Sequence, residues 1–451
     1  MLTWDKIYSF DALLIAATQC YTKCLFQKYK SYTVDVHGDT FYDWARHNKA
    51  NLVRLHNQLK LRTFVYQPFN KKTVKLGSKI RDIYIPSWRD RIVDGMLNVE
   101  LNRHTDIYQS RHSYAYRLKN AGVDICQTRI ASKLFQYEQP LYVVKRDISN
   151  YYPSITKDLM LEKVSLFVQE GDYLWDLVKS RINFSAMQNG KQCVDSGIPF
   201  GSPLSCFLAN LYLIHLDSIM ETHTDVQYFR YADDILFFGP NKEDVVAARA
   251  DMDAELNKLN LKCKPSHSKD VCFFGDGDTE FPKAVALKHL GLYFKDSRLI
   301  GIAREKQRKI LNIFKRVIDR RIGGINRLKT PEARARMIIG LINKAITENI
   351  RPTAVIDYYL KHMTDENQLR TIDRLIAELV LSVATNRGYK KSNFKIISFG
   401  KLREMGLPSL LHRHRLLNHE HLSSNFFDFR VRKKSKVDIK SIKQTSYQDM
   451  P

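Results

Sequence analysis

The adjacent carboxylates Asp233 and Asp234 are the residues of this 451-residue chain whose types and spacing could do chemistry. They interrupt a run, residues 228–239, whose other members are mostly apolar and favour strands. The run predicts two short strands with residues 231–234 at or near the turn. Two carboxylates at the end of a buried hairpin repel each other and lose hydration, which is costly unless a cation lies beside them. Because Mg²⁺ takes oxygen ligands, the pair is a candidate metal site; a solvated acidic turn is the alternative.

A second carboxylate, Asp147, ends another predicted strand. The apolar run 141–144 leads into it, and Pro153 should stop the strand and open a helix over residues 154–168. Asp147 can meet the hairpin carboxylates only if the two strands are neighbours in one sheet.

A third segment, residues 196–213, begins as a Gly/Pro loop and continues as an apolar helix from about Leu204 to Met220. A glycine-rich loop that feeds a helix is also consistent with simple punctuation between elements.

These segments must be positioned by a large and strongly basic protein. The chain has 72 Lys and Arg against 48 Asp and Glu, a formal net charge of +24. This charge favours a polyanionic partner, either nucleic acid or an anionic membrane surface. No run of about 18 uncharged apolar residues indicates a membrane span, and residues 13–17 are too short for a signal-peptide core. Seven cysteines without a Cys-x-x-Cys pair indicate reduced thiols in a cytoplasmic protein.

Taken together and in order, the three segments resemble the palm domain of reverse transcriptases. The resemblance continues through two upstream blocks that look like the fingers of group II intron-type enzymes and two downstream blocks that look like a palm lysine block and a primer-grip hairpin. These blocks are residues 79–93, 113–117, 259–269 and 289–294.

The resemblance covers roughly residues 65–295 and implies an α+β right-hand polymerase. The implied domains are an N-terminal extension (1–65), fingers and palm (66–300), a helical thumb (301–345) and a C-terminal α-helical RNA-binding region with a basic tail (346–451).

The resemblance also implies how the carboxylates work. Asp147 and Asp233 would bind two Mg²⁺ ions, with Mn²⁺ as a substitute, and Asp234 would complete the cluster. The backbone carbonyl of Ile148 would reach a metal, and Lys269 would protonate the leaving pyrophosphate. Phosphoryl transfer with two metals needs such a ligand set.

The incoming deoxynucleoside triphosphate would meet a second group of residues. Tyr152 matches the aromatic steric gate that excludes a ribose 2′-hydroxyl; a packed aromatic is the alternative. Arg81 and Lys79 match basic positions that clamp the triphosphate, although Lys79 is equally consistent with a solvated charge. Phe200 and Gly201 stand where related enzymes carry Gln-Gly, and a Phe can only pack or stack.

This substitution, together with Ser205, resembles the Abi and unknown-group reverse transcriptases of bacterial antiphage defence. The implied partners are an RNA template, a DNA product, and a homo-oligomer or partner protein, with no membrane. The template would be a dedicated noncoding RNA. Three alternatives remain: an intron-type maturase, a protein-primed or untemplated DNA polymerase of Abi type, and an RNA-binding scaffold with a vestigial polymerase.

Beyond the palm the sequence becomes helical and basic. Residues 304–321 predict a thumb helix that Gly323 and Gly324 break, and Thr330 and Pro331 predict the start of the next helix. A loop at 386–393 mixes cations with an aromatic ring, a composition suited to single-stranded RNA, although a solvated basic loop is the alternative. The predicted nucleic-acid ligands, including two arginines farther on, are Arg387, Tyr389, Lys390, Lys391, Arg413 and Arg415. Residues 430–436 predict a basic tail.

Overall fold

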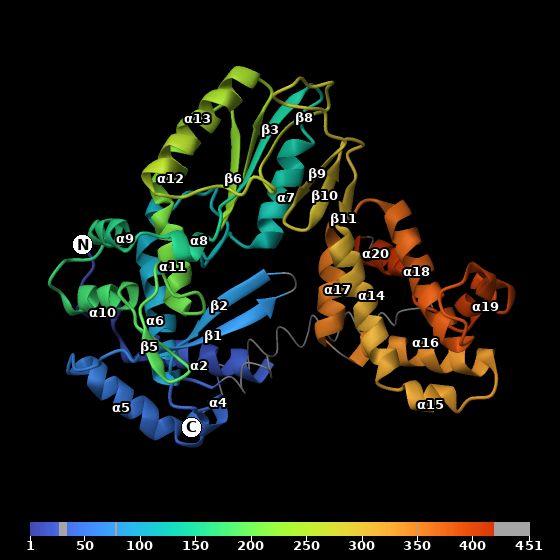
Figure 1. Cartoon of the computed structure of the whole chain (residues 1–451), viewed down its shortest axis with the longest axis horizontal. Helices are drawn as coiled ribbons and strands as arrows, with labels where there is room; N and C mark the ends of the chain where they lie inside the picture. Colours follow the sequence, from blue (N-terminus) through green and yellow to red (C-terminus); the bar gives the residue numbers. More distant parts are fainter. Residues whose placement is uncertain (27–33, 77–78, 349, 419–451) are drawn as a thin grey trace. The chain divides into compact units, whose positions relative to one another are not determined.

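The computed structural model describes residues 1–26, 34–76, 79–348 and 350–418. The chain divides into two compact units, the first ending at Ala284 and the second starting at Val285, so the predicted primer-grip hairpin at 289–294 belongs to the second unit. Figure 1 labels the elements of both units.

The helices of the first unit are α1 (Trp4–Ile7), α2 (Phe10–Phe26), α4 (Phe41–Arg46), α5 (Asn48–Lys60), α6 (Trp88–Thr105), η1 (Asp106–Tyr108), α7 (Val123–Leu134), α8 (Tyr151–Ser154), α9 (Lys157–Ser165), α10 (Tyr173–Ile182), α11 (Pro203–Tyr212), α12 (Ile214–Thr222) and α13 (Lys242–Lys258). Its strands are β1 (Phe69–Leu76), β2 (Lys79–Ile85), β3 (Leu141–Asp147), β4 (Ala186–Gln188), β5 (Lys191–Cys193), β6 (Gln227–Tyr231), β7 (Asp234–Gly239) and β8 (Lys269–Phe273).

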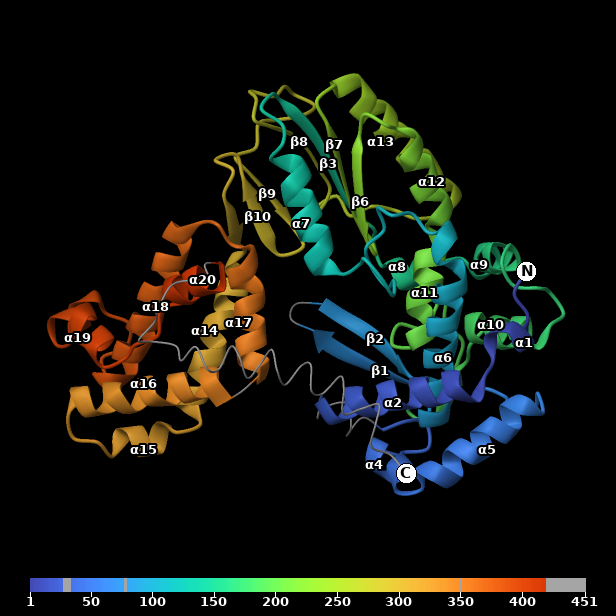
Figure 2. The same cartoon turned by 180° about the vertical axis from the view of Figure 1, so that it is seen from behind.

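The palm sheet is antiparallel, with strand order β6-β7-β3-β8. Strand β7 lies between β6 and β3, and its residues 235–238 are all apolar and fully buried. Since successive side chains of a strand point to opposite faces, both faces of β7 are covered. Helix α13 packs against β3 and β7 and lies along the sheet in Figures 1 and 2. The predicted strand–turn–strand around Asp233 is confirmed.

The fingers sheet has the order β2-β1-β4-β5. Strands β1 and β2 pair antiparallel, and the short β4 joins β1 in parallel. Phe69, Tyr84 and Phe184 pack edge to face in a small buried cluster beside this sheet. This cluster anchors the β1–β2 hairpin at the end opposite its turn.

Helices α6 and α11 lie side by side in the first unit's core (Figures 1 and 2). The apolar helix that the sequence predicts is present as α11 and α12, which only Leu213 separates. Residues 203–222 have the length and a mean hydropathy (1.2) that would suit a membrane span, but 67% of this stretch is buried within the protein, as in a core helix.

One predicted helix, 154–168, is wrong in its bounds. The helical turn α8 starts at Tyr151 and contains Pro153, and the main helix α9 begins only at Lys157. Proline is tolerated in the first turn of a helix, where its missing N–H has no partner to lose. The chain then leaves the helix at Ile155 and re-enters it after Thr156.

The second unit is mostly helical, as predicted. Its elements are β9 (Ala286–His289), β10 (Leu292–Lys295), β11 (Ile300–Ile302), α14 (Arg304–Asp319), α15 (Ile322–Asn326), α16 (Pro331–Glu348), α17 (Ile350–His362), α18 (Glu366–Ala384), η2 (Lys391–Lys395), α19 (Phe399–Glu404) and α20 (Leu410–Asn418). The three strands form an antiparallel sheet.

Helix α14 buries Ile310, Phe314 and Ile318 along one face. It ends at Asp319, and Gly323 and Gly324 lie inside the short helix α15, so they do not form the predicted break. The predicted start of α16 at Pro331 is confirmed. The predicted tail at 430–436 lies outside the described residues.

Candidate active site

The carboxylates of the palm sheet meet at one edge. Asp147, the last residue of β3, lies directly opposite Asp234, the first residue of β7, in the antiparallel register. Asp233 lies in the turn between β6 and β7, and its carbonyl accepts a 3.1 Å hydrogen bond from the backbone N–H of Ile148. The condition set by the sequence, that the two strands be neighbours, is therefore met.

A buried ion pair braces the turn. The Arg230 side chain, 1% exposed, donates from Nε to Asp217 at 2.6 Å and from Nη1 to the carbonyl of Ala232 at 3.2 Å. Ala232 has φ +57°, a left-handed conformation that is unfavourable for any residue with a Cβ. The Tyr228 hydroxyl also donates to Asp217, at 2.8 Å. Sequence reasoning missed this brace, whose signal was an arginine inside an otherwise apolar strand.

Burial raises the pKa of both hairpin carboxyls. For Asp234 burial is the main cause, repulsion from Asp233 and Asp147 adds to it, and the pKa rises to about 6. The pKa of Asp233 is also raised, again chiefly by burial and further by Asp147. A raised carboxyl pKa means that the surroundings disfavour the ionised form. The fold therefore holds these acids where an added positive charge would stabilise them.

Lys264 supplies one such charge. Its Nζ donates to Asp147 Oδ1 at 2.5 Å and to the carbonyl of Ile148 at 3.4 Å, and its backbone N–H donates to the carbonyl of Asp147 at 2.8 Å. A cation thus already contacts two of the oxygens that we predict to hold a metal. The sequence-based assignment passed over Lys264 in favour of Lys269, although both lie in the same block.

The donor set suits Mg²⁺ held together with a substrate. Within the described ranges, no three His, Cys, Asp or Glu side chains form a ready metal cage. Mg²⁺ usually keeps several waters and is bound by one or two carboxylates plus substrate phosphates. Asp147, Asp233 and the carbonyl of Ile148 fit that open arrangement.

The predicted nucleotide-binding residues lie together. Tyr152, in α8, donates its hydroxyl to that of Tyr116 at 3.1 Å. Its ring meets Phe200 edge to face, with the centroids 5.1 Å apart. The guanidinium of Arg81, from β2, lies 5.7 Å from the centroid of the Phe200 ring. The expected sugar gate and the expected triphosphate clamp therefore share one aromatic neighbour.

Two glycines bring the Phe200 loop this close. Gly197 has φ +74°, and a Cβ there would lie 2.2 Å from the carbonyl oxygen of Tyr152. Gly201 has φ +126°, and a Cβ there would lie 2.5 Å from the carbonyl oxygen of Tyr84. The Tyr84 N–H also donates to the Phe200 carbonyl at 2.9 Å. Both positions need glycine, because the backbone has a positive φ and a Cβ would clash with a neighbouring carbonyl. The loop is therefore more than a simple connection between two elements.

The structure gives less support for the roles predicted for Lys79 and Lys269. Lys79 is the first residue of β2, and its side chain lies outside the described residues. Lys269 is exposed at the start of β8, where it pairs across the sheet with Lys145, two residues before Asp147. Its role as proton donor stays a prediction, and Lys264 is the lysine that contacts Asp147.

The predicted nucleic-acid ligands fall into two groups. Those in the loop after α18 and at the start of η2 are exposed: Arg387, Tyr389, Lys390 and Lys391. By contrast, Arg413 pairs with Asp357, with Nη2 2.6 Å from Oδ2, and Arg415 pairs with Glu366 through contacts of 2.8 and 2.6 Å. Because an internal carboxylate already matches each guanidinium, these two arginines attract phosphate less strongly than the loop does.

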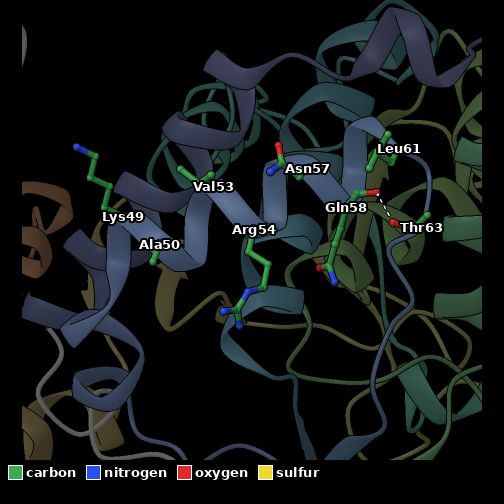
Figure 3. A pocket seen from close by; sticks show the side chains of 8 residues that line it. All are labelled: Lys49, Ala50, Val53, Arg54, Asn57, Gln58, Leu61 and Thr63. Carbon is green, nitrogen blue, oxygen red and sulfur yellow. Dashed lines mark hydrogen bonds between the residues drawn. The ribbon is translucent and has the colours of Figure 1, made fainter.

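A hollow of about 740 Å³ lies along α5, and its lining includes none of the residues above. Figure 3 shows the side chains of Lys49, Arg54 and Gln58 extending from successive turns of that helix. Its lining contains cations and amides but no carboxylate, so this hollow lacks the acidic ligands that the palm edge offers to a metal ion.

Comparison with known proteins adds to this geometry. The family model "Reverse transcriptase (RNA-dependent DNA polymerase)" matches residues 70–311. No curated protein sequence matches significantly. Among solved structures, apo telomerase from Candida tropicalis, truncated from its C-terminal domain, matches with 13% identity and a TM-score of 0.41 over 57% of this chain and 60% of that chain. Telomerase from Candida albicans, solved with a fragment of telomeric RNA, matches with 10% identity and a TM-score of 0.43 over 82% of this chain and 71% of that chain. The chain thus spans 60% of the length of the first of these structures.

Proposed function

The chain belongs to the reverse transcriptase family, and from that premise we propose that it copies a dedicated noncoding RNA into DNA in bacterial antiphage defence. The observation that carries the proposal is the register of Asp147 against Asp234, with Asp233 in the adjoining turn. This register brings together the carboxylates that the family resemblance implies as metal ligands, which supports the proposal of metal-dependent phosphoryl transfer.

Each group has a defined part in DNA synthesis. Asp147, Asp233 and the carbonyl of Ile148 would hold divalent ions. When bound, these ions supply the positive charge that activates the primer 3′-hydroxyl and stabilises the transferring phosphoryl group. Arg81 would bind triphosphate oxygens, and Tyr152 would exclude a 2′-hydroxyl from below the sugar.

Departures from the commoner enzymes support the defence assignment. Phe200 replaces the glutamine that could hydrogen-bond near the nascent base pair. Ser205, the second residue of the Abi-like pattern, donates its hydroxyl to the carbonyl of Pro199 at 2.8 Å and so helps to fix the same loop. The Val-Thr-Gly of retron enzymes does not occur in the sequence.

The experiment is to purify the protein from its host through a wash near 1 M NaCl, sequence the retained RNA, and then add deoxynucleotides with Mg²⁺. We expect one discrete transcript that maps beside the gene, and DNA complementary to it. An intron that contains the gene would replace the defence assignment with a maturase. Discrete RNA without DNA synthesis would favour the scaffold alternative.

A further inference from the structure

A second cavity, of about 310 Å³, lies within the second unit. It is formed by α14, α18 and the loop that follows α18, and it has the volume of a small ligand site. Its lining includes Arg308, Asn312, Lys315, Leu375, Leu379 and Tyr389. No residue of the palm edge or of its nucleotide-binding group takes part.

The two sides of this cavity differ in chemistry. Leu379 is buried and Leu375 half-buried, so α18 provides an apolar wall. Arg308 and Lys315 lie seven residues apart on α14, two turns along the same side of the helix, and both are exposed. Within the described part of the chain, neither pairs with a carboxylate, so both charges are available to an anion.

Tyr389 also lines the cavity, and this residue is 67% exposed. Hydrogen bonds hold the loop that carries Tyr389. Asn393, only 1% exposed, donates its side-chain N–H to the carbonyl of Gly388 at 2.8 Å, and the Lys390 N–H donates to the same carbonyl at 3.1 Å. An exposed ring on a fixed loop is suited to stacking with a planar partner.

We propose that this cavity binds one unpaired nucleotide of the RNA, a step that rests on the proposed function. The base lies between Tyr389 and the leucine wall, and the flanking phosphates meet Arg308 and Lys315. The faces of a paired base are covered by its neighbours in a duplex, whereas an unstacked base in a loop or single strand can stack on an aromatic side chain. Charge and shape together thus select a single-stranded segment.

The first test measures the affinity of the full-length protein for a ten-residue oligouridylate RNA by fluorescence anisotropy. Tyr389→Leu keeps an apolar side chain but removes stacking, so affinity should fall about tenfold, whereas Tyr389→Trp should retain it. The salt dependence of binding should not change in either variant, because no charge is altered.

A matched lysine pair tests the phosphate contacts. Lys315→Gln should weaken binding and reduce its dependence on salt concentration. Lys309→Gln makes the same charge change at an exposed position of the same helix outside the cavity lining, and it should have a smaller effect on both. Two results would overturn the proposal: equal effects of Lys315→Gln and Lys309→Gln, or wild-type affinity in Tyr389→Leu.

Location is settled by photo-crosslinking with a 4-thiouridine oligomer and mapping of the modified peptide. We expect a crosslink in the peptides around Leu375 or Tyr389. Crosslinks confined to residues 1–284 would overturn this site and leave the polymerase intact, which primer extension on a supplied RNA template would verify. Absence of both RNA binding and extension would refute the proposed function itself.

Discussion

The palm edge of the first unit and the loop at 386–393 of the second unit carry opposite charge and are built in opposite ways. At the palm edge, three half-buried carboxylates gather where strand register sets Asp147 opposite Asp234, and Arg230 braces the adjoining turn from inside. In the loop, the cations are exposed and a hydrogen-bonded turn holds them. The difference teaches that the proposed chemistry depends on positions that the whole fold determines, whereas the proposed binding loop needs only charge, a ring and a local turn.

The largest effect is expected when the carboxylates of the palm edge are removed. Asp233→Ala combined with Asp234→Ala should reduce deoxynucleotide incorporation in Mg²⁺ at least about a thousandfold, because it removes metal ligands that act in the transition state. Primer extension measures the loss. Asp276→Ala, which removes a fully exposed carboxylate from the same unit, is the control and should keep activity. A double variant that still extends a primer at the wild-type rate would disprove the site.

The raised pKa of Asp234 predicts how metal-free stability changes with pH. The folded state binds this proton more tightly than the unfolded chain, whose pKa is about 3.9, so the contribution is present below pH 4 and is lost as pH rises through about 6. Relative to Asp234→Asn, the wild type should lose about 2 to 3 kcal/mol of unfolding free energy between pH 4 and pH 7. Urea unfolding in EDTA measures this difference, and parallel pH profiles for the two proteins would contradict it.

Sugar selection should change when the gate is trimmed. Tyr152→Ala opens space beside Phe200, so the ratio of ribonucleotide to deoxynucleotide incorporation should rise about tenfold, equivalent to about 1.4 kcal/mol. Single-nucleotide incorporation kinetics measure the ratio. Tyr152→Phe keeps the ring and should keep most of the selection. An unchanged ratio in the alanine variant would assign Tyr152 to packing alone.

The smallest effect concerns Lys264. Lys264→Met should lower stability in EDTA by about 1 kcal/mol, because the ion pair with Asp147 is partly exposed to solvent. Added Mg²⁺ should stabilise this variant more than the wild type, since the metal replaces the lost charge. Lys262→Met, at an exposed position two residues away, should show neither change. Equal stabilisation of both variants by Mg²⁺ would show that Lys264 and the metal do not share these oxygens.

Much of the palm could be predicted because its signals are local. A run of strand-forming residues around Asp233 defined a hairpin, and the apolar stretch before Asp147 defined its neighbour. The family resemblance then suggested that they share a sheet, which the register confirms. The condition of neighbouring strands was itself physical, since Asp147 ends a strand and can reach the hairpin carboxylates only if that strand lies beside the hairpin.

What could not be predicted depends on contacts between distant segments. The choice of Lys264 over Lys269 follows from how residues 262–264 run beside Asp147 and Ile148, which spacing alone does not reveal. Likewise, the carboxylates Asp357 and Glu366 that pair with Arg413 and Arg415 lie about 50 residues earlier in the chain. A count of basic residues cannot tell a guanidinium bound internally from one open to phosphate.

The close approaches at Gly197 and Gly201 have a mechanical consequence. The loop that carries Phe200 joins two backbones, since the N–H of Ile198 donates to the carbonyl of Tyr152 at 3.1 Å and the N–H of Tyr84 donates to the carbonyl of Phe200 at 2.9 Å. A shift of β2, which carries Arg81, would therefore be transmitted through this loop to the backbone of Tyr152, the proposed sugar gate. If Arg81 and Tyr152 have the roles proposed above, binding of the triphosphate and selection of the sugar would be coupled through this loop.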